Sequence, residues 1–469
     1  MRKKYGDLTK NTILFAISSF GAKIVSFLLL PLYTFVLTTG DYGTADLMTT
    51  AVSLLLPVLT INIQDAVLRF ALDKRYGQQQ VLSVAIRVVG IGTGILLFLL
   101  GLGYQSGLLR VEEQYLFFLI ATFVSHSLYN VFSMYLKSID KVKIFAVCGI
   151  INTLATAVLN IVLLVYVKMG ITGYLIAYAG GSFVAVFCMV IWGKLYQDIS
   201  LFHVDSRILK EMAIYSIPLI ANSLAWWLNT ASDRYILTFF CGAAVNGIYA
   251  VSYKIPTILS TLQHVFYNAW SVSAITEFDA DDKDGFIGNI YALYLSVCIL
   301  ACSGIMLMNI PAARLLYAKD FFEAWKYVPP LLVGTAFNGL ALFEGCLFTA
   351  VKKTKSISRT TMVGAGVNTI LNFSLIPVIG AYGAAIATMV GYMVIWGVRA
   401  CELRKIVKMK VNWFELGGAV ALLMLQMIIA FYEKTQFIQI LLIGALLFVL
   451  RKHFRGIMST ILKKIGMRR

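Results

Sequence analysis

Three charged residues stand deep inside long apolar segments of this sequence. Lys23 lies near the middle of the first segment, Lys254 near the middle of the eighth, and Glu344 two-thirds of the way along the tenth. A charge at the centre of a bilayer costs about 2.5–3.5 kcal/mol on insertion scales, so each residue requires a partner or a cavity. Two lysines facing one cavity would bind an anionic group such as a pyrophosphate. The carboxylate would exchange a proton, bind Na⁺, or neutralise Lys254 or another cation.

The other charges of the apolar segments lie closer to the segment ends. Asp65 and Arg69 are spaced i,i+4, so we expect them to pair. Asp46, Asp233 and Arg234 fall at outer ends, and for all five an interfacial or structural role is favoured over a functional one. The candidates for binding a substrate in a cavity are Lys23, Lys254, Arg69 and Arg234. The candidates for coupling to Na⁺ or H⁺, or for a counter-ion, are Glu344, Asp65, Asp46 and Asp233.

No catalytic or cofactor-binding pattern stands out in the sequence. It has no Gly-Lys-Ser/Thr phosphate loop, no His-Glu-x-x-His and no Gly-x-Ser-x-Gly. The 7 cysteines form no Cys-x-x-Cys, so we interpret them as packing residues and expect no metal site. We therefore expect neither an enzyme nor a cofactor. The predicted loops are too short for an ATP-binding domain, so uphill work would draw on an ion gradient, the membrane potential or removal of the product.

The composition is that of a membrane protein. Hydrophobic residues make up 59% of the 469-residue chain and charged residues 13%, whereas soluble domains average about 45–50% and about 25%. The formal net charge of +17 comes from basic residues in short loops between apolar segments. That placement favours anionic membrane lipid as the partner and argues against nucleic acid.

Fourteen apolar segments are candidates to cross a bilayer, which takes about 20 residues, and the last of them is short. The first is too long for the apolar part of a signal peptide and contains Lys23, so we interpret it as a retained span. The predicted spans are residues 11–37, 44–68, 81–103, 114–136, 144–167, 171–193, 213–231, 244–267, 287–310, 327–350, 358–378, 380–400, 412–432 and 436–450.

The distribution of Lys and Arg predicts the orientation of these spans. With the N-terminus inside, the inner segments carry 30 basic residues and the outer loops 7. The acidic loop from Glu277 to Asp284 is placed inside and departs from this trend. We therefore expect a multi-pass protein of the plasma membrane with both termini in the cytoplasm.

The sequence contains an internal repeat. Asn160 precedes Gly170-Ile-Thr-Gly173, and Asn372 precedes Gly380-Ala-Tyr-Gly383, each where one span passes into the next. An even number of spans separates the copies, so the repeat is parallel, with six helices in each lobe. The predicted domains are residues 1–196 for the N-lobe, 197–211 for a cytoplasmic linker, 212–402 for the C-lobe, and 403–469 for helices 13 and 14 with a basic tail.

Several short motifs, in order along nearly the whole chain, carry a resemblance to a known family. They are Leu30-Pro31-Leu32-Tyr33, Asp41-Tyr42-Gly43, Val67-Leu68-Arg69-Phe70, Tyr215-Ser216-Ile217-Pro218, Ser232-Asp233-Arg234-Tyr235, Asn246-Gly247-Ile248-Tyr249 and Tyr253-Lys254. With the two Gly-x-x-Gly pairs, they resemble the polysaccharide-transporter family of lipid-linked oligosaccharide flippases. That family shares a superfamily with the multidrug-and-toxin extruders and the lipid II flippases.

The resemblance implies an all-α polytopic fold in which two six-helix bundles form a V around a central cavity, followed by two C-terminal helices. It also implies that the substrate is an isoprenyl-pyrophosphate-linked oligosaccharide, moved from the inner to the outer leaflet by alternating access of the two lobes. Glycosyltransferases and a glycan polymerase of a surface-polysaccharide pathway would be partners. Drug extruders of the superfamily usually carry a carboxylate in the first helix, where this sequence has Lys23.

Three other functions remain as alternatives. An ion-coupled exporter of drugs or small molecules would bind cations through carboxylates of the first lobe, and Lys23 disfavours it. A membrane-embedded glycan polymerase would need a large outer loop, which the sequence does not provide. A structural scaffold would explain the helices but not the cations inside them.

Overall fold

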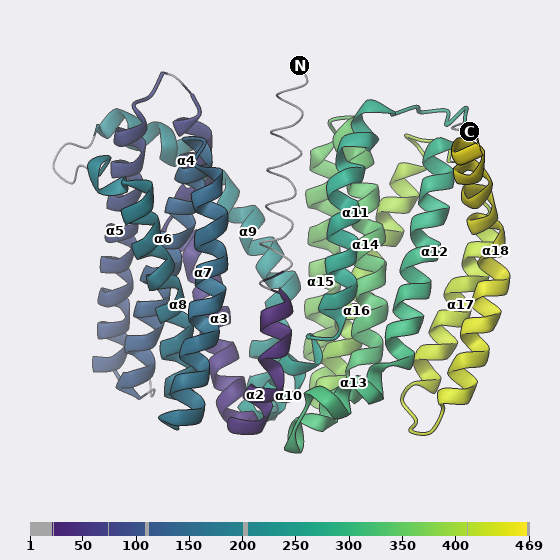
Figure 1. The fold of residues 1–469 in the computed structure, drawn as a ribbon, viewed down its shortest axis with the longest axis horizontal. Helices are drawn as coiled ribbons and strands as arrows, with labels where there is room; N and C mark the ends of the chain where they lie inside the picture. Colours follow the sequence, from purple (N-terminus) through teal and green to yellow (C-terminus); the bar gives the residue numbers. More distant parts are fainter. Residues whose placement is uncertain are drawn as a thin grey trace. The chain divides into compact units, whose positions relative to one another are not determined.

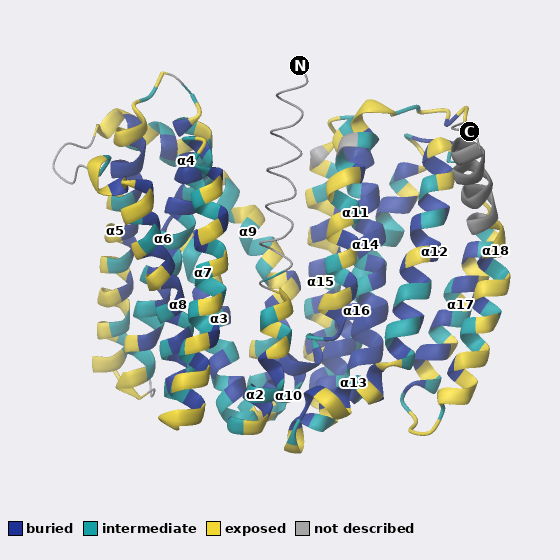
Figure 2. Ribbon diagram, viewed as in Figure 1, coloured by how far each residue is buried: buried dark blue, intermediate teal, exposed yellow. Residues whose placement is uncertain are grey.

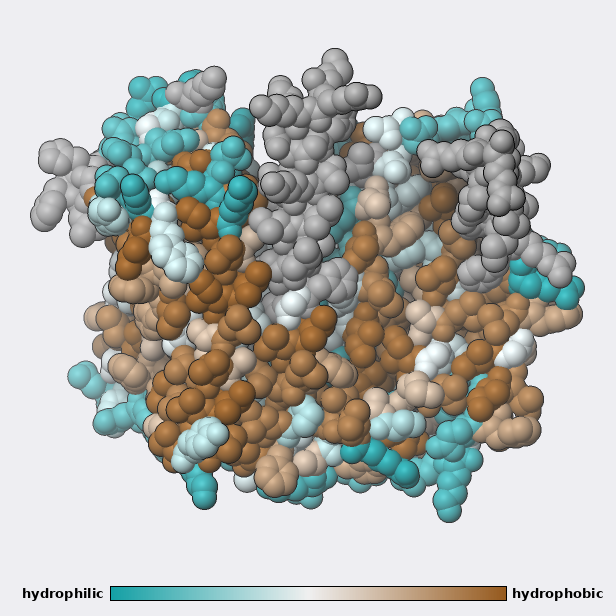
Figure 3. Space-filling model, viewed as in Figure 1, coloured by the Kyte–Doolittle hydropathy of each residue, from teal (hydrophilic) through white to brown (hydrophobic). Residues whose placement is uncertain are grey.

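The computed structural model describes residues 21, 23–73, 75–107, 112–199, 205–409 and 411–466, without the side chains of residues 272, 354 and 453–466. All regular elements of these residues are helices (Figure 1). Hydrophobic side chains cover the middle of the helices and hydrophilic ones gather towards their ends (Figure 3). The predicted fold class, an all-α polytopic membrane protein, is therefore confirmed.

Nine helices of the described residues are long and apolar enough to span a membrane. They are α3 (Thr39–Leu59), α5 (Gln78–Gln105), α6 (Glu113–Ser138), α7 (Val142–Asn160) with its continuation η1 (Ile161–Tyr166), α8 (Gly170–Gly193), α12 (Phe286–Leu307), α14 (Val328–Ala350), α15 (Thr354–Ile379) and α16 (Ala381–Leu403). The other elements are α2 (Leu30–Val36), α4 (Ile63–Ala71), η2 (Leu195–Gln197), α9 (Ser206–Cys241), α10 (Ala243–Ser252), α11 (Pro256–Thr276), α13 (Asn309–Leu316), η3 (Lys319–Lys326), α17 (Trp413–Ile429) and α18 (Gln436–Gly466). The count of fourteen spans stays a prediction, and most of the first span lies outside the described residues.

The chain divides into two compact units, Met1–Trp227 and Leu228–Arg469, called here the first and second unit. The division falls within α9, downstream of the predicted linker of residues 197–211. Residues 200–204 of that linker lie outside the described part of the chain. The predicted domain bounds and the V-shaped arrangement therefore stay predictions.

Each unit contains one copy of the predicted repeat, and in both copies a glycine with positive φ stands at the start of a helix. Gly170 and Gly380 have φ angles of +57° and +59°, a region that glycine enters without strain. Three residues later, Gly173 packs against Leu163 of η1, and Gly383 packs against Leu375 of α15. Close helix packing of this kind requires small residues.

The second predicted span of each lobe is broken instead of continuous. In the first unit α3 ends at Leu59, and Ile61 and Asn62 adopt positive φ before α4 begins. In the second unit a turn over residues 253–255 separates α10 from α11. Pro256 opens α11, because proline lacks the N–H that would continue the preceding helix but fits a first turn.

Helix α14 is the most deeply buried of the candidate spans, and α11, α12, α15 and α16 all pack against it (Figure 2). Its buried side chains include Phe343 and Glu344. The Trp270 ring of α11 stacks on Phe343 at 4.2 Å. The core of the second unit therefore encloses a carboxylate within an aromatic cluster.

Candidate functional site

A cluster of polar side chains surrounds Asp233 inside the second unit. Asp233, on α9, is 3% exposed. Its Oδ2 accepts hydrogen bonds from the hydroxyls of Tyr249 at 2.7 Å and Tyr253 at 2.9 Å, and a longer one from Thr388 at 3.4 Å. Its Oδ1 accepts the backbone N–H of Arg234 at 2.9 Å. The sequence places Asp233 at the outer end of a span, whereas the structure encloses it.

Two asparagines of α15 extend this cluster. Asn368 donates to the Thr388 hydroxyl at 3.4 Å, and Asn372 donates to the Oδ1 of Asn368 at 3.0 Å. Both asparagines are buried, and the Oδ1 of Asn372 has no hydrogen-bond partner. The Asp233 cluster, namely Asp233, Tyr249, Tyr253, Asn368, Asn372 and Thr388, is rich in oxygen atoms and carries one carboxylate. Such a set suits a small hard cation or a proton.

A second buried carboxylate, Glu344 of α14, lies in a different environment. It is fully buried, and its Oε1 accepts one long hydrogen bond, at 3.4 Å, from the Tyr291 hydroxyl of α12. The cation that acts on it electrostatically is Arg399 of α16. Arg399 is itself only 4% exposed. Arg399 stands near the end of the predicted span 380–400, and this position in the sequence conceals that its side chain faces the core.

The two lysines singled out by the sequence lie in different surroundings. Lys23 is exposed on a helical segment before α2. Lys254 is half-buried in the turn between α10 and α11 and therefore not within a continuous helix. The two belong to different units, so a shared cavity stays a prediction.

The remaining candidates of the first unit are not deeply buried. Asp65 is half-buried, Arg69 is exposed at the end of α4, and no ion pair joins them within the described chain, so the predicted pairing is wrong. A four-residue spacing places two side chains on one face of a helix but does not align their ends. Asp46 is half-buried on α3, within electrostatic range of Tyr174 and Tyr178 of α8.

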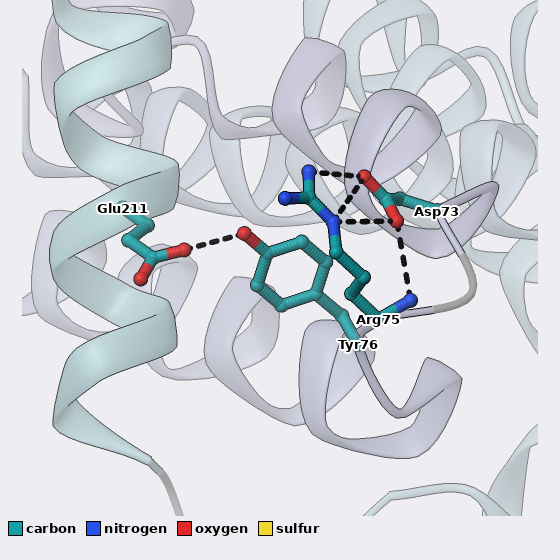
Figure 4. Close-up of polar contacts among 4 residues, drawn as sticks. All are labelled: Asp73, Arg75, Tyr76 and Glu211. Carbon is teal, nitrogen blue, oxygen red and sulfur yellow. Dashed lines mark hydrogen bonds and ion pairs between the residues drawn. The ribbon is translucent and has the colours of Figure 1, made fainter.

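Polar contacts at one end of the first unit connect α9 to the loop before α5 (Figure 4). Arg75 forms an ion pair with Asp73 at 2.7 Å, and its hydrogen bonds lower the pKa of Asp73 to about 2. The Tyr76 hydroxyl donates to Glu211 at 2.5 Å, and this bond raises the pKa of Tyr76. These contacts attach the start of α9 to the first unit.

A family model matches part of this chain, and several solved structures share its fold. The model of a family described as polysaccharide biosynthesis protein matches residues 8–272. A solved lipid II flippase MurJ, in an inward closed conformation, matches with a TM-score of 0.70 and 15% identity, over 95% of this chain and 100% of its own.

Two solved structures of a multidrug resistance MATE family transporter match less closely. The inward-facing one has a TM-score of 0.59 at 13% identity, over 84% of this chain and 96% of its own. The outward-facing one has a TM-score of 0.59 at 14% identity, over 86% of this chain and 97% of its own. No curated protein sequence matches this chain. At these identities the structural matches show the fold.

Proposed function

Because the chain belongs to the polysaccharide biosynthesis protein family, whose model matches more than half of it, we propose a specific substrate and direction for a flippase of this fold. The substrate is an isoprenyl-pyrophosphate-linked oligosaccharide. The protein turns it from the cytoplasmic to the outer leaflet, as a transporter and not as an enzyme, by alternating access of two lobes. Glycosyltransferases supply the substrate, and a glycan polymerase uses it outside.

One observation carries this proposal above the others. The fold match to the lipid II flippase extends over 95% of this chain and all of that protein, at a higher TM-score than the matches to the multidrug transporters. A fold shared with a lipid flippase, in a family described by polysaccharide biosynthesis, supports a sugar carried on a lipid. A multidrug exporter is the alternative that the MATE matches support.

The excess of basic residues in predicted inner segments supports a plasma-membrane location with both termini in the cytoplasm, where they contact anionic lipid. For substrate binding we retain Lys23, Lys254, Arg69 and Arg234 as the cations that contact the pyrophosphate. Lys254 is favoured by its position in a broken helix, because unwound backbone in a membrane protein is tolerated where it lines a cavity or is enclosed by protein.

For ion coupling, the Asp233 cluster is the site that we favour among the four acidic candidates. A buried carboxylate within membrane helices is costly unless it is neutralised. Asp233 accepts hydroxyl hydrogen bonds from Tyr249 and Tyr253, and Arg234 acts on it electrostatically. A bound Na⁺ or H⁺ would neutralise Asp233 between α9, α10 and α16. No organic cofactor is required.

The test is flipping of a lipid-linked oligosaccharide by the purified full-length chain in proteoliposomes. Lys254→Gln and Lys23→Gln are each expected to reduce the rate at least tenfold while insertion is retained. The exposed Lys319 of η3 provides a matched control, and Lys319→Gln should flip normally. Normal flipping by both cavity variants would contradict the assigned residues. Export of a cationic dye without flipping would instead favour the multidrug alternative.

A further inference from the structure

Glu344 is a buried carboxyl group that lacks the donors an ionised carboxylate needs. Its side chain has no exposed surface. Its Oε1 receives only the 3.4 Å hydrogen bond from Tyr291, whose own hydroxyl accepts the Trp396 indole N–H at 2.8 Å. Its Oε2 is buried without any hydrogen-bond partner. Buried carboxylates are otherwise paired or multiply hydrogen-bonded.

Arg399 is the cation that acts electrostatically on Glu344, but its N–H groups donate hydrogen bonds to other acceptors. Its Nε donates to Thr360 at 2.9 Å, one terminal nitrogen donates to the Ala341 carbonyl at 2.6 Å, and the other donates to Thr361 at 2.9 Å. A further contact, at 3.4 Å, reaches the Ile357 carbonyl. No ion pair between Arg399 and Glu344 is present in the described structure. The guanidinium is therefore satisfied by neutral oxygens, and Glu344 is not.

The hydrogen bonds around Glu344 and Arg399 fit a neutral, protonated Glu344. A protonated carboxyl carries no charge to solvate, and the charge of Arg399 is shared among hydroxyl and carbonyl oxygens. An ionised Glu344 would instead be a buried charge that Arg399 affects only at a distance, with one long hydrogen bond and no ion pair. The geometry points to a proton bound at Glu344.

We propose that Glu344 is a proton-binding site, separate from the Asp233 cluster, which exchanges its proton as Arg399 changes partner. In the present conformation the site holds a proton. On release, the proton passes to water, and the guanidinium moves from the Ala341 carbonyl to the new carboxylate. Gly345 permits this short movement, because a Cβ there would come within 3.3 Å of the Arg399 terminal nitrogen. The inference rests on the contacts within the second unit and holds whatever the substrate is.

The exchange would alter the packing of α15. Arg399 connects α15, through Thr360 and Thr361, to the Ala341 carbonyl of α14. When the guanidinium turns to Glu344, that connection is weakened. Helix α15 also carries Asn368 and Asn372 of the Asp233 cluster. Proton release at Glu344 would therefore loosen the helix that contributes to the other ion site.

Among the described residues, Tyr291 and Arg399 are the groups whose charge or hydrogen bond acts on Glu344. Other titratable or charged side chains occur on α14 and on the elements packed against it. They are Cys346 on α14, His264 and Tyr267 on α11, Tyr294, Cys298 and Cys302 on α12, Lys355 and Arg359 on α15, Tyr382, Tyr392, Cys401 and Glu402 on α16, Glu415 on α17, and Lys319, Asp320, Glu323 and Lys326 on η3. Arg359 is paired with Glu402 at 2.5 Å. Glu344, Cys346 and Glu402 all act electrostatically on Arg399. Glu402 is already paired with Arg359, so Glu344 is the fully buried carboxyl group that can gain or lose a proton next to Arg399.

Infrared difference spectra between the full-length wild type and its variants, recorded without substrate, test the proposal. The wild type should show the C=O band of a protonated buried carboxylic acid that is absent from Glu344→Gln and present in Glu402→Gln. The melting temperature of Glu344→Gln should stay near that of the wild type, because a neutral amide replaces a neutral acid. If Glu344→Gln instead lost the band of an ionised carboxylate and its melting temperature fell by a large amount, Glu344 would be a permanently ionised counter-ion of Arg399. That result would overturn the proposal.

A second variant keeps the test decisive if Glu344→Gln does not fold. Tyr291→Phe removes the one hydrogen bond to the carboxyl group, so the acid band should shift in frequency. An unshifted acid band would assign the proton elsewhere and contradict the proposal. Because neither measurement uses a lipid-linked sugar, failure here leaves the proposed flippase function standing, and failure of flipping leaves this proton site standing.

Discussion

The two units contain the same repeat motif but bury different side chains around it. In both, a glycine with positive φ precedes a helix, and an asparagine one helix earlier is buried with its Oδ1 unbonded, Asn160 in the first unit and Asn372 in the second. Within the described residues, however, the first unit buries no charged side chain. The second unit buries Asp233, Asp282, Glu344 and Arg399.

One pair of corresponding positions shows how the units diverged. Five residues after the second glycine of each motif stand Tyr178 in the first unit and Thr388 in the second. Tyr178 stacks on His126, with ring centroids 4.8 Å apart, whereas Thr388 donates to Asp233. The side chain at this position makes an aromatic contact in the first unit and a hydrogen bond to a buried aspartate in the second. The two units thus share the close glycine packing, whereas the described part of the second unit alone buries charged side chains.

The largest expected difference between the units concerns their aspartates. Asp233→Ala removes the acceptor of two buried tyrosine hydroxyls, so we expect a loss of about 3 kcal/mol in the free energy of unfolding, together with loss of ion-dependent transport. Asp46→Ala, at a half-buried position, should cost about 1 kcal/mol or less. Thermal unfolding of the two variants in detergent measures the difference. Equal destabilisation would show that the first unit depends on its aspartate as much as the second does.

The sequence was sufficient for the features set by composition and repetition. Apolar segments predicted the helices, and the Gly-x-x-Gly pairs predicted two copies whose local structure agrees. The sequence was insufficient for features that depend on tertiary packing, such as which charged side chains are buried. Arg399 lies near the end of a span, where lysines and arginines usually reach the interface, and only the packing of α14 and α15 shows that it is enclosed.

The second helix of each lobe shows the same limit. Hydropathy does not register a broken helix, because it is averaged over about 20 residues and the apolar stretches on both sides outweigh the polar residues at the break. Pro256 alone does not say whether a helix bends or stops. The positive φ of Ile61 and Asn62 follows from tertiary structure and has no counterpart in the pattern. For the Asp233 cluster, the sequence identified Asp233 and Asn372 separately but gave no reason to bring them together.

The second glycine of each motif should differ in its tolerance of alanine. A Cβ at Gly383 would lie 2.6 Å from the backbone carbonyl carbon of Leu375, which cannot turn aside, so Gly383→Ala should cost about 3 kcal/mol. At Gly173 the nearest atoms, 3.1 Å away, are the Cβ atoms of Leu163 and Met169, and a small helix shift relieves them. Gly173→Ala should therefore cost about 1 kcal/mol. Melting temperatures of both variants test this order, and the reverse order would mean that the first unit is the more tightly packed.

A smaller effect is expected at the pair Tyr178 and Thr388. Thr388→Val keeps the shape of the side chain but removes its hydroxyl from Asp233 and Asn368, so it should cost about 1 kcal/mol and weaken ion binding. Tyr178→Phe keeps the ring that stacks on His126 and should change stability by about 0.5 kcal/mol or less. Melting curves at low and high Na⁺ compare the two. If Na⁺ stabilises Thr388→Val as strongly as the wild type, Thr388 is not part of the ion site.

The smallest effect concerns the charges that the first unit keeps at its surface. Hydrogen bonds from Arg75 lower the pKa of Asp73 to about 2, below the value of about 3.9 for an unfolded chain. The ion pair therefore adds stability that is fully present above about pH 4 and is lost as the pH falls through about 2. Asp73→Asn should melt slightly below the wild type near neutral pH, and the difference should vanish at low pH. Salt should also reduce it, because Arg75 is 76% exposed and the pair is screened. If the difference in melting temperature persists in high salt, the contact between Arg75 and Asp73 is shielded from solvent. The first unit would then resemble the second in having a charged group that is not exposed to solvent.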